Sequence, residues 1–274
     1  MWKSILSTSA LLTSCAPAFA AIITPDADAW VVRSTLGTGS GSQADDNFGS
    51  GTDLVVKYPG AANGSTVRKA FVTFNLAGYS PGTGSAANDV TSATLRLDVS
   101  GFNGGPTSAT FNVFAVADNL LATASKNGET FTEGTGQTDV TGISPLTYLN
   151  APGMADTANG TDGSASNFAN GGAALGTFTA TTSNLNGSVT FTSAALLSVL
   201  NADTNNILTL VITRNTTGNS TNDNALNTQF ASRETTTLNP PTLFVNQPVP
   251  EPSSALLMFG GLGGLLVGRR RRRI

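Results

Sequence analysis

Residues 91–100 read TSATLRLDVS, and this stretch decides the fold class. Leu95, Leu97 and Val99 alternate with polar residues, so the apolar side chains lie on one side of an extended chain. A period of two over this length predicts a β-strand with one buried face. Residues 68–75 and 207–214 show the same alternation and predict two more strands of the same kind.

Shorter apolar stretches between turn-forming residues complete the pattern. They predict strands at residues 29–33, 53–58, 110–117, 174–179, 188–191, 228–232 and 242–246. One short helix is expected at residues 194–201, because Thr192 or Ser193 can cap its N-terminus. Many strands, turn-rich links and one helix predict an all-β fold, a single β-sandwich or jelly roll.

The C-terminal tail carries three elements in a fixed order. Val249, Pro250, Glu251 and Pro252 precede an apolar segment at 253–268, and a basic cluster follows it, namely Arg269, Arg270, Arg271, Arg272 and Arg273. Arginines beside an apolar segment stay on the cytoplasmic side. Residues 248–274 resemble the PEP-CTERM sorting signal of Gram-negative bacteria, which implies processing by an exosortase. The alternative is a plain tail anchor.

The apolar segment is expected to form a membrane helix that anchors the chain in the inner membrane transiently. It has 16 residues, five of them glycine, whereas a comfortable span needs about 20. At the other terminus, residues 1–20 predict a signal helix with a cleavage site before Ala21. Lipidation at Cys15 is an alternative. We therefore expect an exported domain at 21–247, located at the cell surface or outside the cell after processing.

Composition excludes several classes of function. Residues 21–247 carry sixteen acidic and eight basic side chains, a formal charge of −8, which disfavours nucleic acid. The chain has no histidine and its one cysteine is Cys15, so Ser-His-Asp and Cys-His catalysis and an ordinary zinc site are excluded from the mature domain. Carboxylate pairs remain: Glu129 and Glu133 are close in sequence, and Glu234 could join them. Alternatively, Glu133 and Glu234 pair with Arg33, Arg96 or Arg233.

Motifs spread over residues 26–246 resemble the DNRLRE domain, a jelly-roll family of secreted proteins. They are DADAWVVR at 26–33, DNFG at 46–49, RKAFVTFNL at 68–76, SATLRL at 92–97 and FASRE at 230–234. The resemblance implies a jelly roll. Related domains include carbohydrate-binding modules, some of which bind acidic polymers such as alginate.

The resulting expectation is a non-catalytic surface or extracellular-matrix protein, sorted by an exosortase and associated with the exopolysaccharide of a biofilm. The alternative is a carbohydrate-binding module for an acidic polysaccharide, and a third possibility is a lyase or glycosidase. Sugar binding needs exposed aromatic rings and polar groups, and an acidic polymer also needs cations. The candidate residues are Tyr58, Tyr148, Lys57, Lys69, Arg96 and Arg233.

Calcium is the only metal that the sequence suggests, and no other cofactor is expected. Asp26 and Asp28 open the first predicted strand and are the candidate ligands. The acidic loops at 45–47 and 222–224 offer further oxygens. The alternative is that these residues form turns, since the spacing of an EF-hand does not occur in the sequence.

Overall fold

The computed structural model contains eleven strands, one α-helix and a short 3-10 helix at Thr182–Asn184 within the residues that it describes. These are residues 18–32, 46–58, 67–77, 90–102, 107–134, 144–154, 168, 172–215 and 227–248. The expected all-β character with one α-helix is confirmed in this part of the chain.

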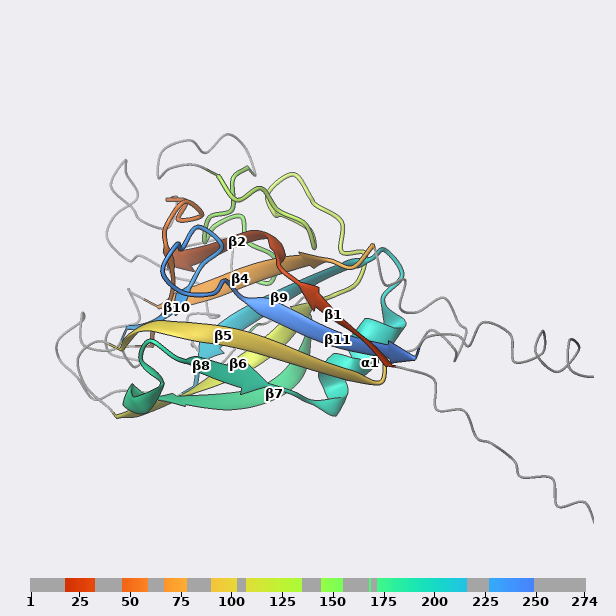
Figure 1. Cartoon of the computed structure of the whole chain (residues 1–274). Coiled ribbons are helices and arrows are strands. Elements are labelled where there is room, and N and C mark those ends of the chain that lie inside the picture. The colour runs from red at the N-terminus through yellow and green to blue at the C-terminus, as the bar shows by residue number, and fades with distance from the viewer. Residues whose placement is uncertain are drawn as a thin grey trace, which may run out of the picture.

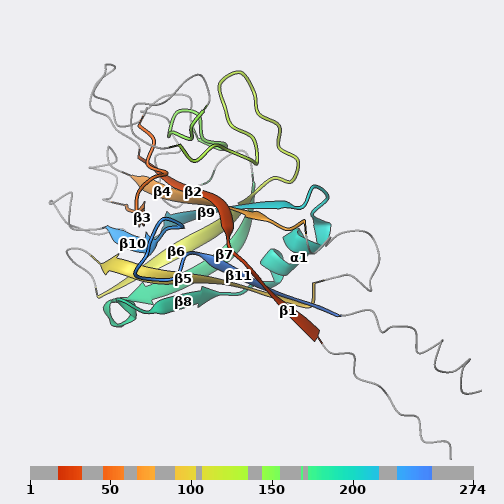
Figure 2. The same cartoon turned by 45° about the horizontal axis from the view of Figure 1, so that its top comes forward.

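The strands form two antiparallel sheets (Figures 1 and 2). The first contains β1 (Ala18–Ile23), β11 (Thr242–Pro248), β5 (Ser92–Phe102), β10 (Thr228–Ala231) and β3 (Asp53–Val56), with β8 (Ser188–Phe191) also paired to β5. The second has the order β2 (Pro25–Val32), β4 (Arg68–Asn75), β9 (Ile207–Arg214), β6 (Ser108–Val116) and β7 (Gly172–Thr181). β2 is therefore an edge strand of the second sheet.

Both sheets contribute to one core. Leu95, Leu97 and Val99 of β5 are buried in it, as the alternation predicted, whereas Arg96 stays half-exposed. Phe111 of β6 stacks on Phe178 of β7 with ring centroids 5.1 Å apart. Each such side chain stabilises the fold by about 1.5–3 kcal/mol relative to an exposed position.

The outer face of the second sheet is also covered. Phe71 of β4 and Val211 of β9 pack with Leu146 and Tyr148, which lie in the loops that follow β6. The strands β4 and β9 are buried on both faces for this reason, and their burial patterns show almost no exposed position. Loop residues thus form a third layer on the second sheet, and the Glu129 carbonyl joins this layer to β9 by accepting a hydrogen bond from Thr209 Oγ1 at 2.6 Å.

The helix α1 (Ala194–Ala202) follows β8, and its N-cap is Ser193, whose Oγ accepts a hydrogen bond from the Leu196 N–H at 2.9 Å. None of the helices in the described part of the chain has the length and apolar character that crossing a membrane requires. The predicted sorting motif at 249–252, the membrane segment at 253–268, the arginine cluster at 269–273 and Cys15 lie outside the described residues.

The N-terminal strand β1 was not predicted. Its pairing runs from Ala18 opposite Pro248 to Ile23 opposite Leu243, so both ends of the described chain leave the first sheet at the same place. Residues 18–20 were assigned to the signal helix, but here they are extended. An alanine-rich stretch has no strong β signal of its own, and β11 supplies the pairing. Cleavage before Ala21 stays a prediction, and it would leave Ala21–Ile23 in the strand.

Candidate functional site

Asp28 lies at the centre of an unusual arrangement of acidic side chains. It belongs to the edge strand β2, opposite Val72 of β4, and its side chain is completely buried. A carboxylate with no solvent exposure needs compensating partners, because burial disfavours its charge. Asp26, the other predicted metal ligand, is exposed.

Glu133 reaches Asp28 because two loops pack backbone against backbone. A Cβ atom at Gly49 would lie 2.0 Å from the carbonyl oxygen of Glu133, so only glycine fits there. The turn that contains Gly49 is fixed by Asn47, whose Oδ1 accepts a hydrogen bond from the Gly49 N–H at 3.1 Å. The Nδ2 of Asn47 donates to the Leu146 carbonyl at 2.8 Å. Asn47 is therefore a turn former, and residues 45 and 222–224 lie outside the described chain.

Glu234 arrives from the turn after β10. Ser232 holds this turn to the loop before β3: its N–H donates to the Thr52 carbonyl at 3.1 Å, and its Oγ donates to the Gly51 carbonyl at 2.6 Å. The Glu234 N–H then donates to the Ser232 Oγ at 3.2 Å. These contacts orient the two charged residues Arg233 and Glu234 toward β2.

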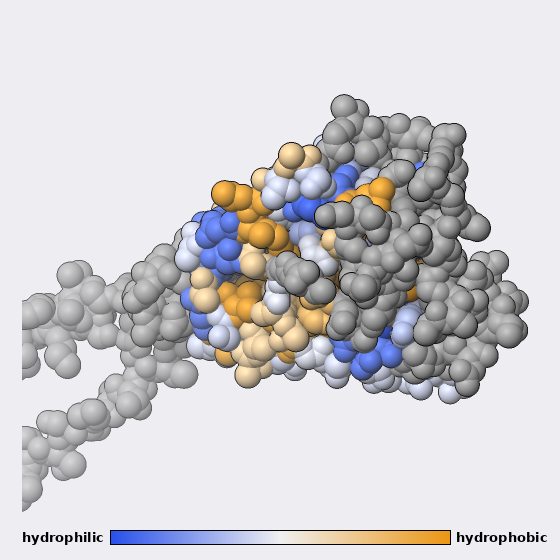
Figure 3. Space-filling model, turned by 180° about the vertical axis from the view of Figure 1, so that it is seen from behind, coloured by the Kyte–Doolittle hydropathy of each residue, from blue (hydrophilic) through white to orange (hydrophobic). Residues whose placement is uncertain are grey.

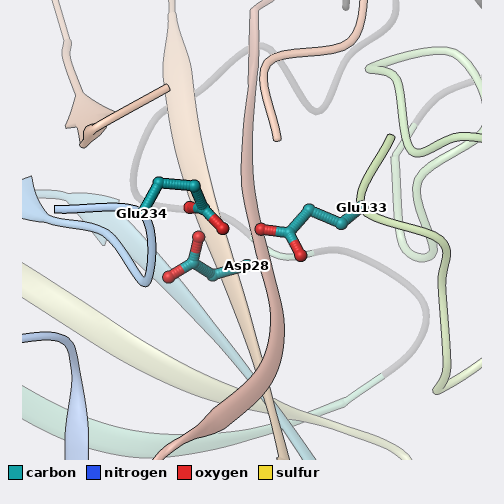
Figure 4. Close-up of side chains that lie close together, drawn as sticks. All are labelled: Asp28, Glu133 and Glu234. Carbon is teal, nitrogen blue, oxygen red and sulfur yellow. The ribbon is translucent and has the colours of Figure 1, made fainter. Parts of the chain in front are cut away.

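We call Asp28, Glu133 and Glu234 the Asp28 cluster (Figure 4). One carboxylate oxygen from each residue lies within 4.8 Å of those of the other two. Arg233 is the common partner. Its backbone N–H donates to Asp28 Oδ2 at 2.8 Å, its Nη2 lies 2.7 Å from Glu133 Oε2, and its Nε lies 3.3 Å from Glu234 Oε1. Its Nη1 contacts the carbonyl oxygen of Asp26.

Each carboxylate of the Asp28 cluster thus directs one oxygen to Arg233 and leaves the other without a partner. Asp28 Oδ1, Glu133 Oε1 and Glu234 Oε2 are shielded from solvent and accept no hydrogen bond. Burial raises the pKa of Asp28 to about 8, and the negative charge of Glu234 adds to the increase. Burial also raises the pKa of Glu133 to about 7, together with its contact with Glu234.

A second group of carboxylates lies under the loops beyond β6, and we call Asp118, Glu129 and Asp203 the Asp203 cluster. Its oxygens also approach within 4.8 Å of one another. Its partners are neutral: Glu129 Oε2 accepts from the Asn119 N–H at 2.9 Å and from Asn205 Nδ2 at 2.6 Å. Asp203 Oδ2 accepts from the Asn206 N–H at 2.8 Å.

The expected approach of Glu133 and Glu234 is therefore found, with Arg233 as the arginine that pairs with them. Glu129 does not join them and belongs to the Asp203 cluster. The long-range contact between Asp28 and Glu133 was missed. The available signal was that Asp28 shares a strand face with Trp30, which packs against the core, so Asp28 is a charged side chain at an inward position.

The residues predicted to bind sugar do not form one surface. Lys57, Lys69 and Tyr148 are fully buried, and Tyr58 is half-buried at the end of β3. Arg96 pairs with Asp98 on β5 at 3.0 Å, and Arg233 belongs to the Asp28 cluster. Among the aromatic side chains whose burial the structure describes, none is largely exposed, and Figure 3 shows small apolar areas separated by polar ones on the face seen there.

Two shallow grooves lined mainly by hydroxyl groups were not predicted. The first has a volume of about 660 Å³ and is lined by Thr52, Asp53, Ser100, Asn186, Thr235, Thr236, Thr237 and Leu238. The second, of about 490 Å³, lies between β7 and β8 and includes Thr177, Thr179, Ser188, Thr190 and Thr192. Both fall in the size range of small-molecule sites. Single threonines give no sequence signal for such a groove, because strands use them everywhere on exposed faces.

Comparison with known protein families gives two matches. Residues 20–131 match carbohydrate-binding module family 96, and residues 248–273 match the PEP-CTERM protein-sorting motif. No curated protein was found to be similar to the chain. The first match ends before β7 to β11, and β9 lies between β4 and β6 in the second sheet, so residues 20–131 alone cannot complete that sheet.

The second match confirms the predicted sorting signal, which indicates an exported protein handled by an exosortase. The first supports the expected resemblance of the β domain to carbohydrate-binding modules. The chain therefore resembles carbohydrate-binding module family 96 over residues 20–131, within a larger two-sheet β fold, and carries a match to the PEP-CTERM protein-sorting motif at its C-terminus.

Proposed function

We propose that the chain is an exported, non-catalytic surface or matrix protein that binds extracellular polysaccharide through the groove beside Asp53. The match of residues 20–131 to a carbohydrate-binding family carries this proposal. The sorting motif supports delivery to the cell surface or beyond, after transient anchoring in the inner membrane. Association with the matrix follows from these two properties together.

The groove beside Asp53 has suitable chemistry for a sugar. Asp53 offers a carboxylate that already accepts a hydrogen bond from the Ser100 hydroxyl, and Thr235, Thr236 and Thr237 add three hydroxyl groups. Sugar hydroxyls both donate and accept hydrogen bonds, so a carboxylate with several hydroxyls can satisfy them. The shallow shape suits a polymer that enters and leaves at the ends.

A neutral polysaccharide fits the described surface better than an acidic one. An acidic polymer needs cations that face it, because the domain carries a formal charge of −8. Lys57 and Lys69 are buried, and Arg96 and Arg233 are paired with carboxylates. Binding of an acidic polymer, with the same grooves, is the competing outcome of the test below.

The absence of catalysis is part of the proposal. Glycosidases need two carboxyl groups that flank a bound sugar. Asp28 is completely buried and Arg233 occupies one oxygen of each carboxylate in its cluster, whereas the groove beside Asp53 is lined by other residues. Incubation with the bound polymer should release no reducing sugar and no unsaturated product.

Retention of the exported protein on immobilised polysaccharides tests the binding proposal. We expect retention on at least one neutral polymer and about tenfold weaker binding for Asp53→Asn, because a charged hydrogen bond contributes about 1.5–3 kcal/mol. Thr190→Ala, in the second groove, is the control and should bind as the wild type does. If the protein is retained only on uronate polymers, the preference for a neutral polysaccharide is wrong. If it is retained on no polymer, the binding proposal is wrong.

Sorting is tested separately with Glu251→Ala. The variant should accumulate as an unprocessed precursor in the membrane, while the wild type is released or re-anchored. Unchanged processing indicates a plain tail anchor and leaves the carbohydrate test unaffected.

A further inference from the structure

In their ionised form, the three unpartnered oxygens of the Asp28 cluster need a positive partner that the described chain does not provide. Asp28 is completely buried, its Oδ1 has no hydrogen-bond partner, and one of its carboxylate oxygens points toward Glu234 (Figure 4). Leaving one buried acceptor without a partner costs about 1–3 kcal/mol, and more when it is charged. Three such oxygens at one place are therefore an expensive arrangement unless something binds them.

We propose that Asp28, Glu133 and Glu234 bind a calcium ion. When all three carboxyl groups are ionised, as they are when they bind a metal ion, they face one guanidinium group and two negative charges remain, which a divalent cation balances. An ion of charge +2 brings the cluster and Arg233 to neutrality. Arg233 does not block the ion, because it contacts the other oxygen of each carboxylate.

The ligand type favours calcium. The cluster offers oxygen alone, which suits the hard cations Ca²⁺ and Mg²⁺. Calcium accepts carboxylates in flexible geometries, whereas magnesium demands a near-ideal octahedron and keeps several of its water ligands. One carboxylate oxygen from each residue of the Asp28 cluster lies within 4.8 Å of those of the other two, so one ion can contact all three.

A calcium ion here would join three distant parts of the chain. Asp28 belongs to β2, Glu133 to the loops after β6, and Glu234 to the turn after β10. A ligand that binds only the folded state stabilises it in proportion to the logarithm of its concentration. The site thus performs a structural task that does not depend on sugar binding, and its test is independent of the polysaccharide experiment.

Calcium binding is measured on the full chain in detergent, stripped with EGTA, by titration calorimetry and thermal unfolding. We expect one tight site per chain and a Tm that rises with calcium concentration. Asp28→Asn and Glu133→Gln should each lose the tight site while keeping the far-ultraviolet circular dichroism of the wild type. Asp203→Asn, in the other cluster, is the matched control and should keep the site.

Terbium luminescence gives a second, local measurement, because Trp30 is two residues from Asp28 on the same strand face. Terbium emission sensitised by Trp30 should appear in the wild type and in Asp203→Asn and disappear in Asp28→Asn. The proposal is overturned if calcium does not bind tightly or if magnesium binds with equal affinity. It is also overturned if the site survives Asp28→Asn and is lost in Asp203→Asn.

Discussion

The two carboxylate clusters of this domain each bring three acidic groups within 4.8 Å of one another, and they stabilise them by different means. The Asp203 cluster is surrounded by amide and hydroxyl donors, which hold the loops around α1 and β9 in place. The Asp28 cluster has an arginine instead, and it leaves three solvent-shielded oxygens unpartnered, whereas Asp203 Oδ1 is the one such oxygen of the Asp203 cluster in the described chain. The number of unmet acceptors, and not the proximity of the carboxylates, is thus what distinguishes the two clusters.

The largest effect is expected from Gly49→Ala. The added methyl group would overlap the Glu133 carbonyl at 2.0 Å, so the loop that carries Glu133 must move away from Asp28. We expect a loss of about 3 kcal/mol of stability, typical of overpacking, and a lower Tm. Gly51→Ala is the control, since its nearest atom would lie at an ordinary 3.6 Å. If Gly49→Ala and Gly51→Ala have the same Tm, the tight contact between the backbone at Gly49 and that at Glu133 is contradicted.

Arg233→Gln tests whether the Asp28 cluster, unlike the Asp203 cluster, depends on a positive charge. It removes the only cation that contacts the Asp28 cluster in the described chain, and Arg233 is itself partly exposed, so a loss of about 1–2 kcal/mol is expected in EGTA. Saturating calcium should restore most of this loss. Urea unfolding with and without calcium measures it, with Arg96→Gln as a control. A loss that calcium leaves unchanged argues against the charge balance proposed for the site.

Asp203→Ala should cost about 1 kcal/mol, because the Asn206 N–H loses its acceptor while one of three close negative charges disappears. Calcium should change the stability of this variant as much as it changes that of the wild type. Asp118→Ala, at the exposed member of the same cluster, should cost less. If calcium no longer stabilises Asp203→Ala, the ion binds at the Asp203 cluster and not at the Asp28 cluster.

The smallest effect concerns pH. Burial raises the pKa of Glu129 to about 6, above its ordinary value of 4.5, so the folded state binds more protons between these values. Stability should therefore fall as the pH rises from about 4.5 to 7.5, by on the order of 1 kcal/mol for this group. Glu129→Gln has no such proton to lose, so the difference between wild type and variant should change with pH. A constant difference contradicts the raised pKa.

Much of the fold could be predicted because its signals are local. The strands at 68–75, 188–191 and 207–214 and the cap of α1 agree with the structure to within a residue. β1 could not be predicted, because its pairing partner lies more than 200 residues away at β11. The burial of Tyr148 was missed for a similar reason: the loops form a layer over the second sheet, and a loop gives no periodic signal of the face it covers.

The Asp28 cluster could be predicted only in part. Glu133 and Glu234 were expected to meet an arginine, and Asp28 was proposed as a metal ligand, but their convergence depends on how the turn after β10 and the loop beside Gly49 pack. Those contacts join residues far apart in the sequence. The predicted sugar-binding surface was wrong, because the pattern of charged residues along a strand does not show which face of the sheet is covered by loops.

The pairing of β1 with β11 has a consequence for the order of proteolysis. Residues 18–20 lie opposite Asn246, Gln247 and Pro248, directly before the sorting motif. Removal of the signal peptide before Ala21 would take these partners away, and Gln247 and Pro248 would then have no strand beside them, since β5 pairs only as far as Asn246. A cut at the N-terminus would thus release the backbone next to the sorting motif, and access of a protease to the tail would then depend on prior removal of the signal peptide.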